Sequence, residues 1–132
     1  MKHQVPGLHG ATPFPEGFFL VRVTEAYYRT RTDKPFLAID LVVTGPAALA
    51  GRRIPIRLYC THKALWRLNW FLQDFGYDPE LFGRDQIDAK AVVGLCGVIK
   101  ISHSQVAGRS FVSLDGFAPA AHWDEFRLEK AG

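Results

Sequence analysis

The order of β-rich runs around one amphipathic helix is the feature that most constrains how this chain can fold. Apolar and polar residues alternate with a period of two in the β-rich runs, which is typical of strands with one buried face. Between the third and fourth runs, apolar residues recur at helical spacing and include two tryptophans. The sequence therefore predicts the element order β-β-β-α-β-β. The expected strands are 18–24, 35–44, 52–60, 91–103 and 109–117, and the expected helix is 61–76. The apolar positions of the first three strands and of the helix are Phe19, Val21 and Val23, then Leu37, Ile39, Leu41 and Val43, then Ile54, Ile56 and Leu58, and finally Leu65, Leu68, Leu72 and Phe75.

Element order and chain length together indicate a fold class. A chain of 132 residues with 48% hydrophobic residues can bury the core of one domain without disulfides or metal. Five strands with a helix after the third are the layout of an OB-fold, a small Greek-key barrel. We therefore predict a mostly β protein whose five-stranded OB-fold barrel covers 15–117. An irregular leader at 1–14 precedes the barrel, and a tail at 118–132 forms a short C-terminal helix.

Proline and glycine refine the expected strands. Pro55 in the third strand predicts an edge position or a bulge, because proline lacks the N–H of the ladder. Gly94 and Gly97 lie inside the expected fourth strand and indicate a bulge or a tight bend. Ala107-Gly108 predicts the hairpin turn between the last two strands.

Positive charge is concentrated in the first three expected strands and their connections. Residues 1–76 contain ten Lys or Arg and five Asp or Glu, whereas residues 77–132 contain six and eight. OB-folds hold oligonucleotides or oligosaccharides on one strand face and in the loops between strands 1 and 2 and strands 4 and 5. Charge at this place favours a nucleic-acid ligand, although basic residues are also typical of an ordinary solvated surface. The basic residues of the first loop are Arg29, Arg31 and Lys34.

The outward face of the first three strands combines aromatic rings with arginines. Single-strand binders pair a positive groove with rings on which bases stack, and arginine also binds phosphate through two N–H groups. We therefore expect this face and the basic loop to bind nucleic acid. The alternative is that the leader or the C-terminal helix covers Phe18 and Phe36. The predicted nucleic-acid-binding residues are Phe18, Arg22, Arg29, Arg31, Lys34, Phe36, Arg53, Arg57 and Tyr59.

Other kinds of site find little support in the sequence. The candidate metal ligands lack the paired spacing of zinc sites, so we expect no metal and no cofactor. The chain has no nucleophile elbow, phosphate-binding loop or dinucleotide motif, so we expect no enzymatic activity. A catalytic site assembled from distant residues is the remaining alternative. The metal-ligand candidates are Cys60, His62, Cys96 and His103.

The sequence also indicates a cellular location. The first residues lack the continuous apolar run of a secretory signal, and no run approaches the roughly 18 apolar residues of a spanning helix. Two cysteines in such a chain are typical of reduced thiols. We therefore expect a cytoplasmic protein that does not contact membranes.

Trp66 and Trp70 lie four residues apart and widen the apolar surface of the expected helix. They either pack against the end of the barrel or form an interface with another protein.

Several short motifs lie along the expected strands and helix. They are Pro15-Glu16-Gly17-Phe18, Gly51-Arg52-Arg53-Ile54, Lys63-Ala64-Leu65-Trp66-Arg67-Leu68, Phe71-Leu72, Gly76 and Val93-Gly94. Together they resemble the motifs of the phage and prophage family DUF669. The resemblance covers about 15–117 and implies an OB-like barrel that binds single-stranded DNA during replication or recombination. The matching positions are turn glycines and helix core residues, so the resemblance assigns no binding residue. The leader and the helix containing Trp123 are not features of the family.

We therefore expect a non-enzymatic protein that binds single-stranded DNA with little sequence preference and works with replication or recombination proteins. The main alternative is a protein–protein adaptor that docks a partner through its aromatic face or the Trp66/Trp70 helix. Oligosaccharide binding by aromatic stacking is a third hypothesis, but it leaves the basic loop unexplained. RNA in place of DNA, and a homo-oligomer in place of a monomer, remain alternatives.

Overall fold

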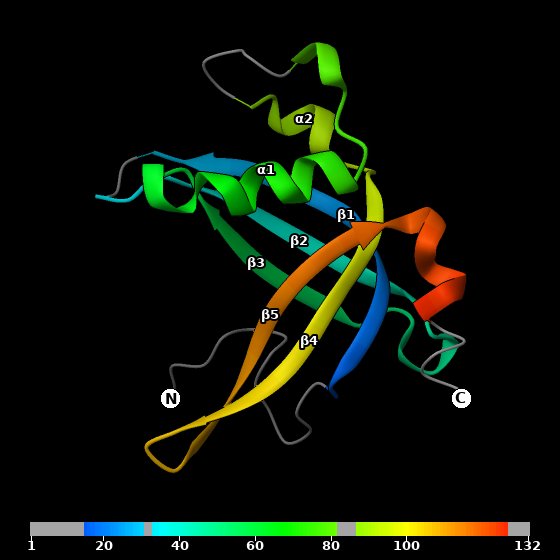
Figure 1. Ribbon diagram of the computed structural model, residues 1–132. Helices are drawn as coiled ribbons and strands as arrows, with labels where there is room; N and C mark the ends of the chain where they lie inside the picture. Colours follow the sequence, from blue (N-terminus) through cyan, green and yellow to red (C-terminus); the bar gives the residue numbers. More distant parts are fainter. Residues whose placement is uncertain (1–14, 31–32, 82–86, 127–132) are drawn as a thin grey trace.

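A single five-stranded antiparallel sheet dominates the structure, a computed structural model that describes residues 15–30, 33–81 and 87–126 (Figure 1). The strand order is β3-β2-β1-β4-β5, so every neighbouring pair except β1 and β4 is consecutive in the chain. The prediction of a mostly β chain with five strands and a helix after the third is confirmed. The strands are β1 Gly17–Arg29, β2 Phe36–Gly45, β3 Arg53–Tyr59, β4 Cys96–Val106 and β5 Arg109–Pro119, and the helices are α1 Leu65–Asp74 and α2 Ala89–Val92.

The sheet is open, with β3 and β5 as its two edges. The closed barrel expected from the sequence is therefore not formed by hydrogen bonds within the described part of the chain. Instead, α1 contacts both edge strands and lies across the inner face of the sheet (Figure 1). Pro55 accordingly lies on an edge strand, where it pairs with Asp40 in regular register. Of the two predictions for Pro55, the edge position is correct and the bulge is not.

The inner face of the sheet and α1 together form the hydrophobic core. Every second residue of β2 from Leu37 to Val43 is buried, as the alternation predicted. Leu65 was expected in the apolar stripe of the helix but is 41% exposed. The residues before it form a separate 3-10 turn, so Leu65 lies at the first, exposed position of α1. The residues that α1 and its C-terminal end contribute to the core are Leu68, Phe71, Leu72 and Phe75.

The largest difference from the predicted elements lies just before β4. The apolar run expected to begin a strand at residue 91 forms α2 instead, and β4 begins only at Cys96. The Asp88 side chain caps α2 by accepting a hydrogen bond from the Lys90 N–H at 3.0 Å. Gly94 then adopts a φ of +93° in the turn before the strand. A short apolar run fits a buried helix and a buried strand equally well, so its periodicity could not distinguish them.

The C-terminal segment covers one end of the outer face of the sheet. As expected, a helical segment follows β5, with a 3-10 turn at Ala120–His122 and a helical turn at 123–126. A Cβ built on Gly45 would lie 3.0 Å from the Trp123 ring, so this indole packs directly on the end of β2. Phe126 stacks on Phe18 with ring centroids 4.5 Å apart. The other end of the outer face, where β1 ends and β2 begins, carries the candidate site.

Candidate nucleic-acid interface

A bulge in β1 determines which of its side chains lie on the outer face. The pairing of β1 with β2 shifts register between Val23 and Glu25. Before the shift, the odd-numbered residues of β1 are buried; after it, the even-numbered Ala26 and Tyr28 pack against the core. The outer face of the second half of β1 therefore carries Glu25, Tyr27 and Arg29.

Two rows of cross-strand neighbours gather rings and arginines at this end of the sheet. In one row, Arg29 of β1, Phe36 of β2 and Tyr59 of β3 are register partners. In the next outer row the partners are Tyr27, Ala38 and Arg57. Cross-strand partners have Cβ atoms roughly 4.5–5.5 Å apart, so the side chains of a row can touch. We define the basic aromatic patch as Tyr27, Arg29, Phe36, Arg57 and Tyr59.

Each arginine of the basic aromatic patch stacks on a ring. The Arg29 Cζ lies 4.6 Å from the centroid of the Tyr27 ring, and the Arg57 Cζ lies 4.7 Å from that of Phe36. The Phe36 and Tyr59 rings are 5.5 Å apart and tilted by 57°. A guanidinium stacked through its flat face keeps its N–H edge available for a phosphate. The patch thus holds two guanidinium groups in place with rings.

The three rings differ in what they can bind. Tyr27 is 40% exposed and Tyr59 is half-buried, so both rings can receive a stacked base. Phe36 is only 8% exposed, since Arg57 stacks on its ring and Tyr59 packs beside it. Phe36 is therefore the buried member of the patch and supports Arg57 and Tyr59, rather than lying on the surface as expected from the sequence.

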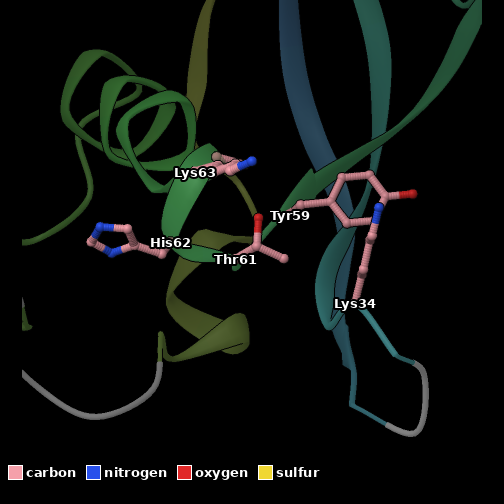
Figure 2. Close-up of a pocket in the computed structure, with 6 residues that line it drawn as sticks. Lys34, Tyr59, Thr61, His62 and Lys63 are labelled. Atoms are coloured by element: carbon pink, nitrogen blue, oxygen red, sulfur yellow. The ribbon is translucent and has the colours of Figure 1, made fainter.

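A hollow adjoins the patch beyond Tyr59, where the chain passes from β3 into α1 (Figure 2). Its volume is about 690 Å³. The Cys60 N–H donates to the Pro35 carbonyl oxygen at 2.9 Å, which extends the β2–β3 pairing and brings the residue before Pro35 towards the start of α1. The lining residues are Lys34, Tyr59, Thr61, His62, Lys63 and Ala64.

The structure divides the single patch that was expected from the sequence. Arg29, Phe36, Arg57 and Tyr59 come together, and Lys34 lines the adjoining hollow. Arg31 lies outside the described residues.

Three further predicted residues lie away from the basic aromatic patch. Phe18 stacks on Phe126 at the covered end of the sheet, which was the alternative stated for Phe18. Arg22 and Arg53 are exposed and share an outer row with Val42. The row between them and the patch consists of Glu25, Asp40 and Pro55. Two carboxylates therefore separate the basic residues at the two ends of the outer face.

Tyr27 is the patch residue that sequence reasoning missed. The first strand was expected to end at residue 24, with Arg29 in the loop that follows it. Strand β1 instead continues to Arg29, and the Thr24 hydroxyl donates to the Asp40 carbonyl oxygen at 3.2 Å beside the register shift. The available signal was the alternation itself, which resumes one residue out of phase after Thr24.

On the opposite, inner face, Tyr28 and Cys60 are half-buried ionisable groups. The Tyr28 hydroxyl accepts a hydrogen bond from the Ile87 N–H at 2.6 Å. Burial raises the pKa of Tyr28, and it also raises the pKa of the Cys60 thiol. Both groups therefore stay protonated at neutral pH. The described residues contain no group of three His, Cys, Asp or Glu side chains that could hold a metal ion.

No protein-family model matches this sequence, and the search of curated proteins also found no match. None of the helices in the described ranges has the length and apolar character needed to cross a membrane.

Proposed function

We propose that this protein binds single-stranded DNA with little sequence preference and catalyses no reaction. The basic aromatic patch carries the proposal, because it places two accessible tyrosine rings beside two stacked guanidinium groups on an exposed sheet face. Single-strand binders combine positive charge for the backbone with rings for the bases. Every base has a π face, so stacking tolerates any sequence.

An OB-like fold is part of this proposal. An OB-fold is a five-stranded, partly open Greek-key barrel that binds ligands on its strand 2–3 face and in the loop between strands 1 and 2. The sheet has five strands, a helix after β3 and open edges bridged by α1. The patch lies on β1, β2 and β3 beside the first loop. Together with the motifs that resemble DUF669, this placement supports a role in phage or prophage replication or recombination, in the cytoplasm.

Each member of the patch has a separate role in the proposal. Arg29 and Arg57 contact phosphates, while Tyr27 and Tyr59 stack bases. A stacked base contributes about 1–3 kcal/mol, whereas each phosphate contact adds about 0.7 to the slope of log affinity against log salt. The two kinds of contact can therefore be measured independently.

The test is fluorescence anisotropy of a labelled oligo-dT of about 30 nucleotides, long enough for one OB-sized site of about 4–16 nucleotides. A duplex of equal length is the control ligand. We expect preference for the single strand and weaker binding as salt increases. Equal affinity for the duplex, or no binding at low salt, would contradict the proposal.

Variants of the patch identify where the strand lies. Arg57→Ala should reduce the salt slope by about 0.7, and Tyr59→Ala should weaken binding by about 1–3 kcal/mol with little change of slope. Lys90→Ala is the matched control, since Lys90 is exposed on α2, whose neighbouring side chains pack on the inner face. If Arg57→Ala behaves like Lys90→Ala, the patch is not the binding site.

A protein–protein adaptor is the second candidate, and one observation favours it. Trp66 is 62% exposed, although tryptophan is usually well buried. A partner docked on this ring would be insensitive to salt compared with DNA. Trp66→Ala should then abolish capture of a protein that the wild type retains, while binding of oligo-dT stays unchanged.

A further inference from the structure

The hollow beyond Tyr59 has the chemistry of a phosphate site. Lys34 reaches it from the segment before β2, and Lys63 reaches it from the turn before α1 (Figure 2). Thr61 lies between them along the lining and offers a hydroxyl donor. None of the side chains that line the hollow is acidic. Its volume of about 690 Å³ lies within the range of about 300–1,000 Å³ typical of small-ligand pockets.

A DNA strand bound at the basic aromatic patch has two directions in which to continue over the outer face. If the DNA ran parallel to the β-strands, it would next cross the row that contains Glu25 and Asp40, whose carboxylates repel phosphate. If the DNA ran across the β-strands, it would follow the row from Arg29 over Phe36 to Tyr59 and then enter the hollow. Only the path across the β-strands avoids these carboxylates and leads the DNA backbone from Arg29 to the lysines of the hollow.

We propose that the hollow is a separate nucleotide subsite, in which Lys34 and Lys63 bind the phosphate that follows the base stacked on Tyr59. This inference rests on the proposed function and deepens it. It assigns the path of the bound DNA, which crosses β1, β2 and β3 and leaves the sheet at the start of α1. It also assigns a binding role to Thr61 and Lys63, which sequence reasoning did not include.

The test measures the salt dependence of binding to a labelled oligo-dT of about 12 nucleotides, a length that one small domain can cover. Lys63→Ala should reduce the slope of log affinity against log salt by about 0.7, the value for one phosphate contact on a single strand. Lys34→Ala should do the same. Lys100→Ala is the matched control, because Lys100 lies on β4 beside Phe18, and β2 and β1 separate β4 from β3. Its slope should equal that of the wild type.

The outcomes separate this inference from the proposed function. If the wild type does not bind the single strand, both are overturned. If the wild type binds and Arg57→Ala lowers the slope, but Lys63→Ala matches Lys100→Ala, the subsite is overturned and the proposed function stands. A slope lowered by Arg53→Ala and not by Lys63→Ala would show that the strand runs along the sheet instead.

A second readout does not depend on affinity. In an amide NMR titration with the same oligo-dT, the backbone resonances of Thr61, His62 and Lys63 should shift together with that of Tyr59. Circular dichroism and thermal unfolding of each variant verify that the surface substitutions leave the fold intact. Shifts confined to the sheet, with residues 61–63 unchanged, would overturn the subsite.

Discussion

At the scale of single residues, a missing side chain determines how closely two layers approach. Gly97 in β4 lies against the Phe75 ring, and a Cβ built on Gly97 would be 2.4 Å from that ring. The sequence assigned Gly97 to a bulge or a bend. The register shift of β4 lies instead between Lys100 and Ile101, so Gly97 serves close packing.

Gly97→Ala should therefore destabilise the protein. An inserted methyl group in a packed core forces neighbouring groups to move, and we expect the free energy of unfolding to fall by about 1–3 kcal/mol in guanidinium titrations. Phe75→Leu removes the ring that the methyl group meets, so the double variant should lose less than the sum of the single variants. Purely additive losses would show that the Phe75 ring is not the obstacle.

The two cysteines should differ in reactivity because one thiol is half-buried and the other is exposed. Burial raises the pKa of the Cys60 thiol, whereas Cys96 is exposed at the start of β4. Because the thiolate is the reacting form, iodoacetamide near neutral pH should modify Cys96 at least about tenfold faster than Cys60. Mass spectrometry of Cys60→Ser and Cys96→Ser variants assigns the two rates. Equal rates would mean that Cys60 is accessible in solution.

At the scale of elements, α1 connects the two edges of the open sheet. The Arg67 guanidinium donates a hydrogen bond to the Leu114 carbonyl oxygen of β5. The Trp70 ring meets the Phe117 ring edge-on at 5.4 Å, and its Nε1–H donates to an Asp74 carboxylate oxygen at 2.9 Å. The Trp66 and Trp70 rings stack on each other with centroids 6.1 Å apart, but Trp70 also packs on Phe117 of β5, whereas Trp66 is largely exposed.

Alanine substitution should separate the two tryptophans. Trp70→Ala removes a ring packed on Phe117 and should lower the free energy of unfolding by about 3 kcal/mol. Trp66→Ala removes an exposed ring that stacks on Trp70, and should lower it by about 0.5–1.5 kcal/mol, the value of one aromatic pair. Denaturant titrations measure both values. Comparable losses would mean that Trp66 also packs against the sheet.

The sequence predicted the elements well where periodicity was long and less well where it was short. Alternation correctly assigned the buried side of β2, and helical spacing correctly assigned Leu68 and Leu72. Two elements were missed: α2, whose four residues are too few for a distinct period, and the second half of β1, where the bulge inverts the alternation.

At the scale of the whole molecule, the two faces of the sheet have different surroundings. The helices α1 and α2 pack on the inner face, while the outer face is shared between the C-terminal segment and the basic aromatic patch (Figure 1). One contact links distant parts of the fold, because the Tyr28 hydroxyl of β1 accepts the Ile87 N–H just before α2. The stability of the molecule should depend on this link.

The free energy of unfolding should fall in alkaline solution because the Tyr28 hydroxyl loses its proton there. Burial raises the pKa of Tyr28 in the folded chain above the ordinary value of about 10. Its contribution to the free energy of unfolding is therefore complete below about pH 10 and is lost as the pH rises through the folded pKa. Tyr28→Phe lacks both the titration and the acceptor for Ile87. The variant should therefore be less stable near pH 7, and its difference from the wild type should shrink above about pH 10. Denaturation at several pH values measures this difference. A difference independent of pH would rule out Tyr28 as the group responsible.

The sequence by itself determined the number of strands, the place of α1, the buried side chains of β2 and of the first half of β1, and the concentration of positive charge near the first loop. These properties depend on local periodicity and on composition, which neighbouring residues reveal. Only the tertiary structure decided that Tyr27 joins Arg57 and that Phe18 is covered by Phe126. It also placed two carboxylates between Arg57 and Arg53. Register and cross-strand contact join residues far apart in the chain, and one bulge at residue 24 changed which of them share a face.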